Sequence, residues 1–316
     1  MQTGLKIAAF AAAAAATFGT AYGVGSAAGP VVAEKRPAAH DQHGAPTQDA
    51  ESEHGGHAEA GAAADAVPGG LQVSERGYTL DLERDRLPDR TGELRFTIRK
   101  DAEHAGGGAH GEDGAHGEDG SGEPVTAYKK EHGKELHLIV ASRDLTAYRH
   151  LHPVRAADGT WSTPVSLPKA GDYRVFADFT PQGEKEGLTL GAGLGVAGTY
   201  KPAPLPEHST KARVEGGYEV RVKGDLTAGA TSELTLGVSK DGKPVTDLEP
   251  YLGAYGHLVA LRSGDLAYLH VHPHDGRPGP EVSFTATAPS PGTYRLFLDF
   301  KHDGEVRTAA FTVHAA

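Results

Sequence analysis

The chain has 316 residues, no cysteine, one methionine and a formal net charge of −11. Without cysteine it has neither disulfides nor thiolate metal sites, and a single methionine at position 1 excludes copper(I) sites built on thioethers. The acidic balance argues against nucleic acid as a partner, and the length allows about two domains.

Residues 1–33 carry one charge, Lys6, ahead of an uncharged run rich in alanine and glycine. This layout is typical of a secretory signal or of an uncleaved N-terminal membrane anchor. Small residues at Ser26 and Ala28 suit signal peptidase, whereas more than about 20 uncharged residues are enough to span a bilayer. Both alternatives place the folded part outside the cytoplasmic membrane, either secreted or tethered by residues 7–28, with no other membrane contact.

The next segment, residues 34–68, consists mainly of alanine, glycine, proline, histidine and acidic residues and has no apolar period. This composition predicts a disordered linker. The linker contains two H-x-x-H pairs, His40 with His43 and His54 with His57. We interpret it as a solvated low-complexity tether, with weak metal capture as the alternative.

The folded part contains an internal duplication. Alternating apolar residues predict strands at 78–82 and 94–98, which match 218–222 and 234–238 at an offset of 140. From the hairpins onward the two copies match at an offset of 120. The first copy therefore contains a loop insert at about 101–123, where the second copy has a tight turn at 240–243.

Each copy contains a hairpin with three histidines, and the two copies form predicted domains at 69–205 and 206–316. The hairpin at 136–153 carries His137, His150 and His152, and the hairpin at 256–273 carries His257, His270 and His272. Two-residue turns at Arg143–Asp144 and Ser263–Gly264 predict a register in which His137 faces His150 and His257 faces His270. The third histidine of each hairpin falls on the same face because side chains alternate along a strand.

A segment after each hairpin is also repeated, since residues 170–179 parallel residues 291–300. A small residue followed by Tyr173 or Tyr294 resembles the tyrosine corner of immunoglobulin-like sandwiches. Val175 and Leu296 stand where antibody domains have cysteine, so the resemblance implies the architecture without the disulfide, and it implies no activity. The expected fold is all-β, with two tandem immunoglobulin-like β-sandwich domains.

Strand parity predicts which side chains point away from each core. On this outward face each domain has three histidines, one aspartate (Asp178 or Asp299) and large apolar groups. The aromatic residues of the face are Tyr148, Phe176, Tyr268 and Phe297. A clustered apolar surface indicates a contact site, so we expect the two faces to pack on one another, as antibody variable domains do, or to bind a protein partner.

Three imidazoles that converge with a carboxylate are a frequent ligand set for zinc or copper(II). The predicted metal ligands are His137, His150, His152, Asp178, His257, His270, His272 and Asp299, with the aspartates as a fourth ligand or as acceptors for ring N–H groups. The competing interpretation is that the histidines only pack and hydrogen-bond across the sheet. The histidines without a repeat partner, interpreted as incidental although His274 is near enough to join, are His132, His208, His274, His302 and His314.

The hairpin with its H-x-H-P ending is similar to a set of actinobacterial exported proteins sometimes described as heavy-metal-binding. This resemblance implies export and metal handling. We therefore predict an extracytoplasmic metal-binding protein, with a cell-surface adhesion or interaction module as the alternative. No nucleophile elbow, Gly-rich phosphate loop or H-E-x-x-H motif is present in the sequence. We therefore do not expect an enzyme, and a metallohydrolase is only the third hypothesis.

Overall fold

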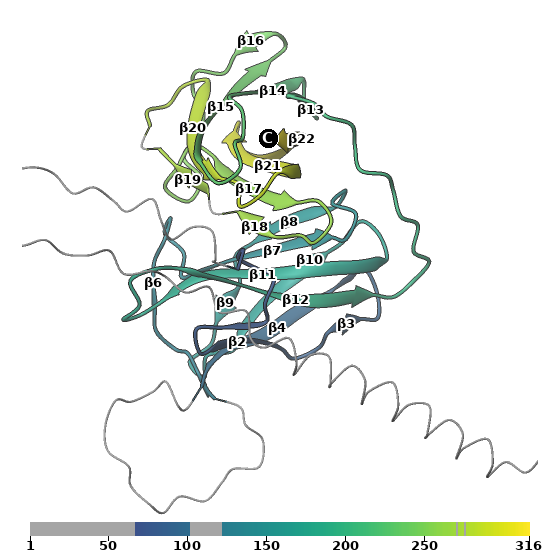
Figure 1. Ribbon diagram of the computed structural model, residues 1–316, viewed down its shortest axis with the longest axis vertical. Helices are drawn as coiled ribbons and strands as arrows, with labels where there is room; N and C mark the ends of the chain where they lie inside the picture. Colours follow the sequence, from purple (N-terminus) through teal and green to yellow (C-terminus); the bar gives the residue numbers. More distant parts are fainter. Residues whose placement is uncertain (1–66, 102–121, 270, 275) are drawn as a thin grey trace, which may run out of the picture. The chain divides into compact units, whose positions relative to one another are not determined.

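The computed structural model describes residues 67–101, 122–269, 271–274 and 276–316. The predicted leader and almost all of the predicted linker and loop insert lie outside these residues, as does His270. Within the described part all regular structure is β-strand, and Figure 1 shows the strands gathered in two sandwiches. This confirms the predicted fold of two tandem immunoglobulin-like sandwiches.

The first sandwich contains strands β1 to β12 in two sheets. One sheet has the order β1 (Ser74–Glu75), β2 (Tyr78–Leu82), β4 (Thr91–Lys100), β10 (Trp161–Ser166) and β9 (Val154–Arg155), with β5 (Glu123–Pro124) on β4. The other has the order β3 (Arg86–Leu87), β12 (Leu188–Val196), β11 (Gly171–Pro181), β7 (Leu136–Ser142) and β8 (Tyr148–Leu151), with β6 (Tyr128–Lys129) on β11.

The second sandwich, strands β13 to β22, repeats this arrangement. Its first sheet has the order β13 (Lys211–Val214), β14 (Tyr218–Lys223), β15 (Thr231–Lys240), β20 (Glu281–Thr287) and β19 (Val271–Pro273), with β16 (Lys243–Pro244) on β15. Its second sheet has the order β18 (Tyr268–Leu269), β17 (His257–Arg262), β21 (Gly292–His302) and β22 (Glu305–Ala315). The order β8-β7-β11-β12 thus recurs as β18-β17-β21-β22, as the duplication requires.

Alternation along the strands builds a separate core inside each sandwich. On β7, Leu138 and Val140 are buried in the first core, whereas Ile139 between them faces the other way. On β21, Leu296 and Leu298 are buried in the second core, and Phe297 between them faces outward. The period of two that defines a strand therefore produces two apolar faces on one sheet.

Both tyrosine corners are present. The Tyr173 hydroxyl donates to the carbonyl of Lys169 at 2.8 Å, and the Tyr294 hydroxyl donates to the carbonyl of Ser290 at 2.7 Å. Each bond joins a buried strand to the loop before it, so the ring is fixed at both ends. The predicted immunoglobulin-like corner is confirmed in both sandwiches.

We expect Tyr294→Phe to lower the free energy of unfolding by about 1 kcal/mol, because the ring stays in the core while the Ser290 carbonyl loses its donor. Urea unfolding of the variant and of the native chain measures this difference. Tyr200→Phe, at an exposed tyrosine, is the control and should leave the unfolding free energy unchanged.

The predicted hairpin register is wrong by two residues in both copies. Ile139 pairs with His150, and Leu261 pairs with Tyr268. The two-residue turns are in fact four-residue loops, closed by the bonds from the Ser142 amide to Ala147 and from the Arg262 amide to Ala267.

Aspartate side chains hold the wider loops. The Asp144 carboxylate accepts bonds from the Ser142 hydroxyl at 2.7 Å and the Thr146 hydroxyl at 2.9 Å, and Asp265 accepts one from the Ala267 amide. Such aspartate turns were not recognised in the sequence. Because the shift is an even number of residues, every side chain keeps its predicted face.

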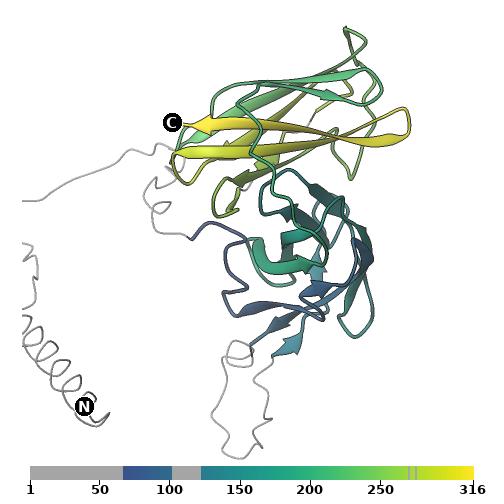
Figure 2. The same cartoon turned by 90° about the vertical axis from the view of Figure 1, so that its right-hand side faces the viewer.

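The histidine-bearing sheets of the two sandwiches pack against each other through a third apolar cluster (Figures 1 and 2). We call this the inter-sandwich cluster, and its buried members are Ile139, Ala141, Leu145, Tyr148, Phe176, Val259, Leu261, Leu266, Tyr268 and Phe297. Tyr148 stacks on Phe297 with ring centroids 4.3 Å apart, and Phe176 contacts Tyr268 at 5.7 Å. Corresponding residues of the two copies thus meet in reciprocal pairs.

Candidate metal centre

Three histidines of the first sandwich meet at one edge of the inter-sandwich cluster. His137 lies on β7, His150 on β8, and His152 follows β8 directly. One ring nitrogen from each lies within 4.8 Å of the corresponding nitrogens of the other two. We call these three residues the histidine cluster.

Outer hydrogen bonds determine which nitrogen of two of these rings carries the proton. His137 Nε2 lies 3.2 Å from the carbonyl oxygen of Glu131, and His150 Nδ1 lies 3.0 Å from a carboxylate oxygen of Asp299. Because both partners accept, both of these nitrogens are N–H donors. In neutral rings the remaining nitrogens, His137 Nδ1 and His150 Nε2, are therefore bare lone pairs.

These two lone pairs face each other at 3.0 Å. With the protons placed in this way neither nitrogen can donate to the other, and a shared cation, either a proton or a metal ion, would satisfy both. A proton is disfavoured at neutral pH, since burial and then the neighbouring His150 lower the pKa of His137 to about 4. The geometry would suit two metal ligands whose outer nitrogens are held by acceptors.

His152 supplies a third nitrogen. Its Nε2 is buried and has no hydrogen-bond partner anywhere in the described part of the chain. Burial, followed by the charges of His150 and His137, lowers the pKa of His152 to about 3. A buried polar atom without a partner is rare and costly, and a metal ion bound by the cluster would supply the missing interaction.

The second sandwich contributes His257 and Asp299 to the same place. The His257 ring lies 6.2 Å from the His137 ring and 6.0 Å from the His150 ring, and its Nε2 donates to the Tyr251 carbonyl at 2.7 Å. Burial lowers the pKa of His257 to about 4. His257 thus borders the cluster as a fourth neutral imidazole.

Asp299 is 2% exposed and accepts bonds from side chains of both sandwiches. Besides His150, its carboxylate accepts from the Tyr148 hydroxyl at 3.1 Å and from the Thr308 hydroxyl at 2.5 Å. Since two of these three donors come from the first sandwich, Asp299 both orients His150 and joins the two sandwiches.

Two tight turns at equivalent positions place the carbonyls that orient the histidines. Glu131 pairs with Lys134 around His132 and Gly133, and Tyr251 pairs with Ala254 around the corresponding Leu252 and Gly253. His132 and Leu252 have φ of 49° and 54°, followed in each turn by glycine with φ near 80°. These turns were not predicted from the sequence, although their glycines recur 120 residues apart and could have revealed them.

His132, interpreted from the sequence as incidental, lies beside the cluster. Its ring is 5.1 Å from the ring of His257 and 6.3 Å from that of His137. His274 instead contacts Thr285 and Glu233 on the surface, and His302 is bonded to Tyr218 and Asp247.

The other predicted ligands have different positions. Asp178 is paired with His137 across β11 and β7, accepts a bond from Thr189 at 3.0 Å and lines the same small cavity as His137 and His150. His270 is outside the described residues. The backbone of His272 belongs to β19, which pairs with β20 in the opposite sheet, so the expected continuation of the hairpin through His272 is wrong.

The residues present fit a metal ion. With metal–nitrogen bonds of about 2.0–2.1 Å, ring centroids in a tetrahedral imidazole site lie about 5 Å apart. The centroids of His137, His150 and His152 are 4.7–5.3 Å apart. The adjoining cavity of about 90 Å³ also has room for a water molecule or an additional ligand atom.

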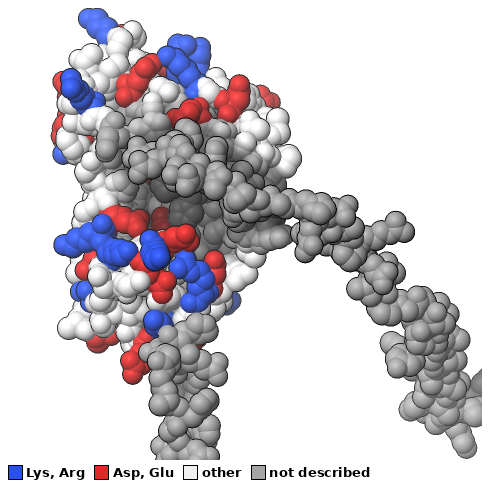
Figure 3. Space-filling model, turned by 60° about the vertical axis from the view of Figure 1, so that its left-hand side comes forward, with Lys and Arg blue, Asp and Glu red and all other residues white. Residues whose placement is uncertain are grey.

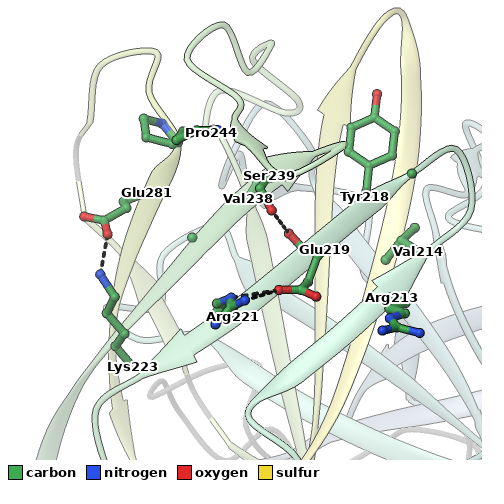
Figure 4. Close-up of a pocket in the computed structure, with 14 residues that line it drawn as sticks. Arg213, Val214, Tyr218, Glu219, Arg221, Lys223, Val238, Ser239, Pro244 and Glu281 are labelled. Carbon is green, nitrogen blue, oxygen red and sulfur yellow. Dashed lines mark hydrogen bonds and ion pairs between the residues drawn. The ribbon is translucent and has the colours of Figure 1, made fainter.

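Among the described residues, no second group of three or more metal-ligating side chains was found at such spacing. A cavity of about 670 Å³ lies against β14 and β15, where Arg221 pairs with Glu219 and Lys223 with Glu281 (Figure 4). Acidic and basic side chains are interspersed on the face drawn in Figure 3.

Comparison with known proteins places the chain in a family. The family described as "Domain of unknown function (DUF8832)" matches residues 116–190 and 212–316, which is more than half of the chain. The chain belongs to the DUF8832 family. The matched DUF8832 segments include His137, His150 and His152 in the first sandwich and His257 and Asp299 in the second. No curated protein matches the sequence.

Solved structures similar to this DUF8832 chain include bacterial surface proteins. The Escherichia coli adhesin FdeC is 17% identical over 79% of this chain and 67% of its own, with a TM-score of 0.22. The D0–D1 domain of intimin is 14% identical over 75% and 96%, and the Yersinia pseudotuberculosis adhesin InvE is 12% identical over 77% and 60%, both with TM-scores of 0.22. At these scores the likeness carries no conclusion about function.

Proposed function

We propose that the chain is an extracytoplasmic protein that binds a divalent transition metal ion between its two sandwiches. The observation that carries the proposal is the pair of bare nitrogens, His137 Nδ1 and His150 Nε2, that face each other at 3.0 Å. The partnerless Nε2 of His152 supports it. Packing alone leaves all three nitrogens without a donor.

Neutral imidazoles favour zinc or copper(II) over calcium and magnesium, which prefer oxygen ligands. Asp299 would hold the Nδ1–H of His150 and make the ring a better ligand, and the Glu131 carbonyl would do the same for His137. In this proposal the protein sequesters or carries the ion.

His152→Ala separates metal binding from a purely structural role. The variant removes a buried nitrogen that has no partner, so the metal-free protein should keep its unfolding free energy within about 1 kcal/mol. The affinity for zinc or copper(II) should fall on the order of 100-fold, because a ligand is lost.

The measurement is metal titration of the full chain against a competing chelator, which counts only tight sites and suppresses weak binding by the remaining histidines. His208→Ala, at an exposed histidine outside the cluster, is the control and should bind like the native chain. If His152→Ala binds metal as tightly as His208→Ala and the native chain do, the cluster is not a metal site.

An adhesion or interaction module is the second candidate. The comparisons with solved structures favour this alternative over metal binding, since FdeC and InvE are adhesins. The aromatic face predicted for a partner is buried in the inter-sandwich cluster, so a partner would bind elsewhere. Partner binding that persists in His152→Ala while metal binding is lost would assign the two activities to separate surfaces.

The extracytoplasmic location is part of the proposal and is supported by the predicted leader, residues 1–33. Among the described residues, no helix has the length and apolar character needed to cross a membrane. Protease treatment of intact cells that express the full chain tests whether the sandwiches are exposed outside the membrane.

A further inference from the structure

The histidine cluster is half-buried and lies against fully buried groups, which raises the question of how an ion reaches it. The side chains of His150 and Asp299 are 6% and 3% exposed, and His257 is 7% exposed. A hydrated divalent ion cannot shed its water before new ligands are in place, because an uncompensated charge in a buried site is very unfavourable. A ligand that is both exposed and adjacent to the cluster would therefore help an ion to enter it.

His132 has both properties. It is exposed at the tip of its turn, and its ring contacts His257 at 5.1 Å and His137 at 6.3 Å. It lines the cavity of about 90 Å³ that His137, His150 and His257 also line. His132 also lines a second, polar cavity of about 580 Å³. Pro273 lines both cavities too. His132 thus stands where the two cavities adjoin.

The turn itself does not explain the imidazole. The equivalent turn of the second sandwich has Leu252 at the same left-handed position, with φ of 54° against 49° for His132. A leucine therefore suffices to close this turn. Unlike its counterpart, His132 offers a nitrogen ligand beside the histidine cluster.

We propose that His132 is an uptake ligand, which binds the hydrated ion at the larger cavity and passes it to the histidine cluster. This inference rests on the proposed metal-binding function. In the transfer, waters on the ion are replaced one at a time by cluster nitrogens, and the bond to His132 is broken last.

A ligand that acts only during uptake affects rates and leaves the equilibrium unchanged. We expect His132→Asn to slow association on the order of tenfold, because the ion is no longer held at high effective concentration beside the cluster. Dissociation should slow by the same factor, so that Kd is unchanged. Asparagine is chosen because it tolerates the left-handed backbone.

The experiment uses the full metal-free chain mixed rapidly with cobalt(II), whose visible absorption reports nitrogen coordination. Leu252→Asn is the matched control, since it makes the same change at the equivalent turn without loss of an imidazole, and it should keep native rates. Unchanged rates in His132→Asn overturn the inference, and so does a weaker Kd with unchanged association, which would make His132 a resident ligand. If the native chain shows no tight site that His152→Ala removes, the proposed function itself is wrong.

Discussion

Replacing Asp299 with alanine is expected to weaken both the fold and the metal centre. The substitution leaves the buried donors of Tyr148 and His150 without an acceptor, and it also removes the acceptor of the exposed Thr308. Removing one partner from a buried charged network typically costs about 3–5 kcal/mol. The free energy of unfolding should fall by an amount in this range, as measured by urea unfolding of the metal-free protein.

Asp299→Ala should also lower metal affinity by about 10- to 100-fold, because the acceptor that holds the His150 ring is lost. Tyr148→Phe is the comparison, since it removes one donor from Asp299 and leaves the carboxylate bonded to His150. This variant should lose about 1 kcal/mol of stability and little affinity. Equal loss of affinity in the two variants would show that Asp299 acts only through general packing.

Acid should destabilise the metal-free protein between about pH 6.5 and pH 4. His137 and His257 have folded pKa values of about 4 and His152 of about 3, against 6.5 for the unfolded reference, with burial as the main cause. In this interval the unfolded chain binds protons that the folded chain does not. Stability is therefore full above pH 6.5 and is lost as the pH falls, by up to about 1.4 kcal/mol per pH unit for each of His137 and His257 and by less for the more exposed His152.

Urea unfolding in the presence of a chelator at pH 7.5, 6 and 5 measures this dependence. His152→Ala should show a smaller slope than the native chain because one of the three groups is absent, whereas His208→Ala should retain the native slope. Saturating zinc should stabilise the protein at pH 7.5 and lose this effect in acid, since protonated imidazoles do not bind metal. An unfolding free energy that is the same at pH 7.5 and 5 would contradict the assigned burial of these histidines.

The strands, the duplication and the tyrosine corners were predictable because they depend on local patterns. Alternation places Leu138 and Val140 on one face of β7 and Ile139 on the other whatever the rest of the chain does. The hairpin register was not predictable in this way, since the aspartates Asp144 and Asp265 close a loop two residues longer than the turn that the sequence favoured.

The sequence by itself determined the fold, the outward direction of His137 and His150, and their place on neighbouring strands. Only the tertiary structure decided that Asp299 of the second sandwich bonds to His150 of the first, and that His132 and His257 lie against the same cluster. The physical reason is that strand parity tells which face a side chain occupies. What that face meets depends on packing between segments more than 100 residues apart, and no local pattern encodes it.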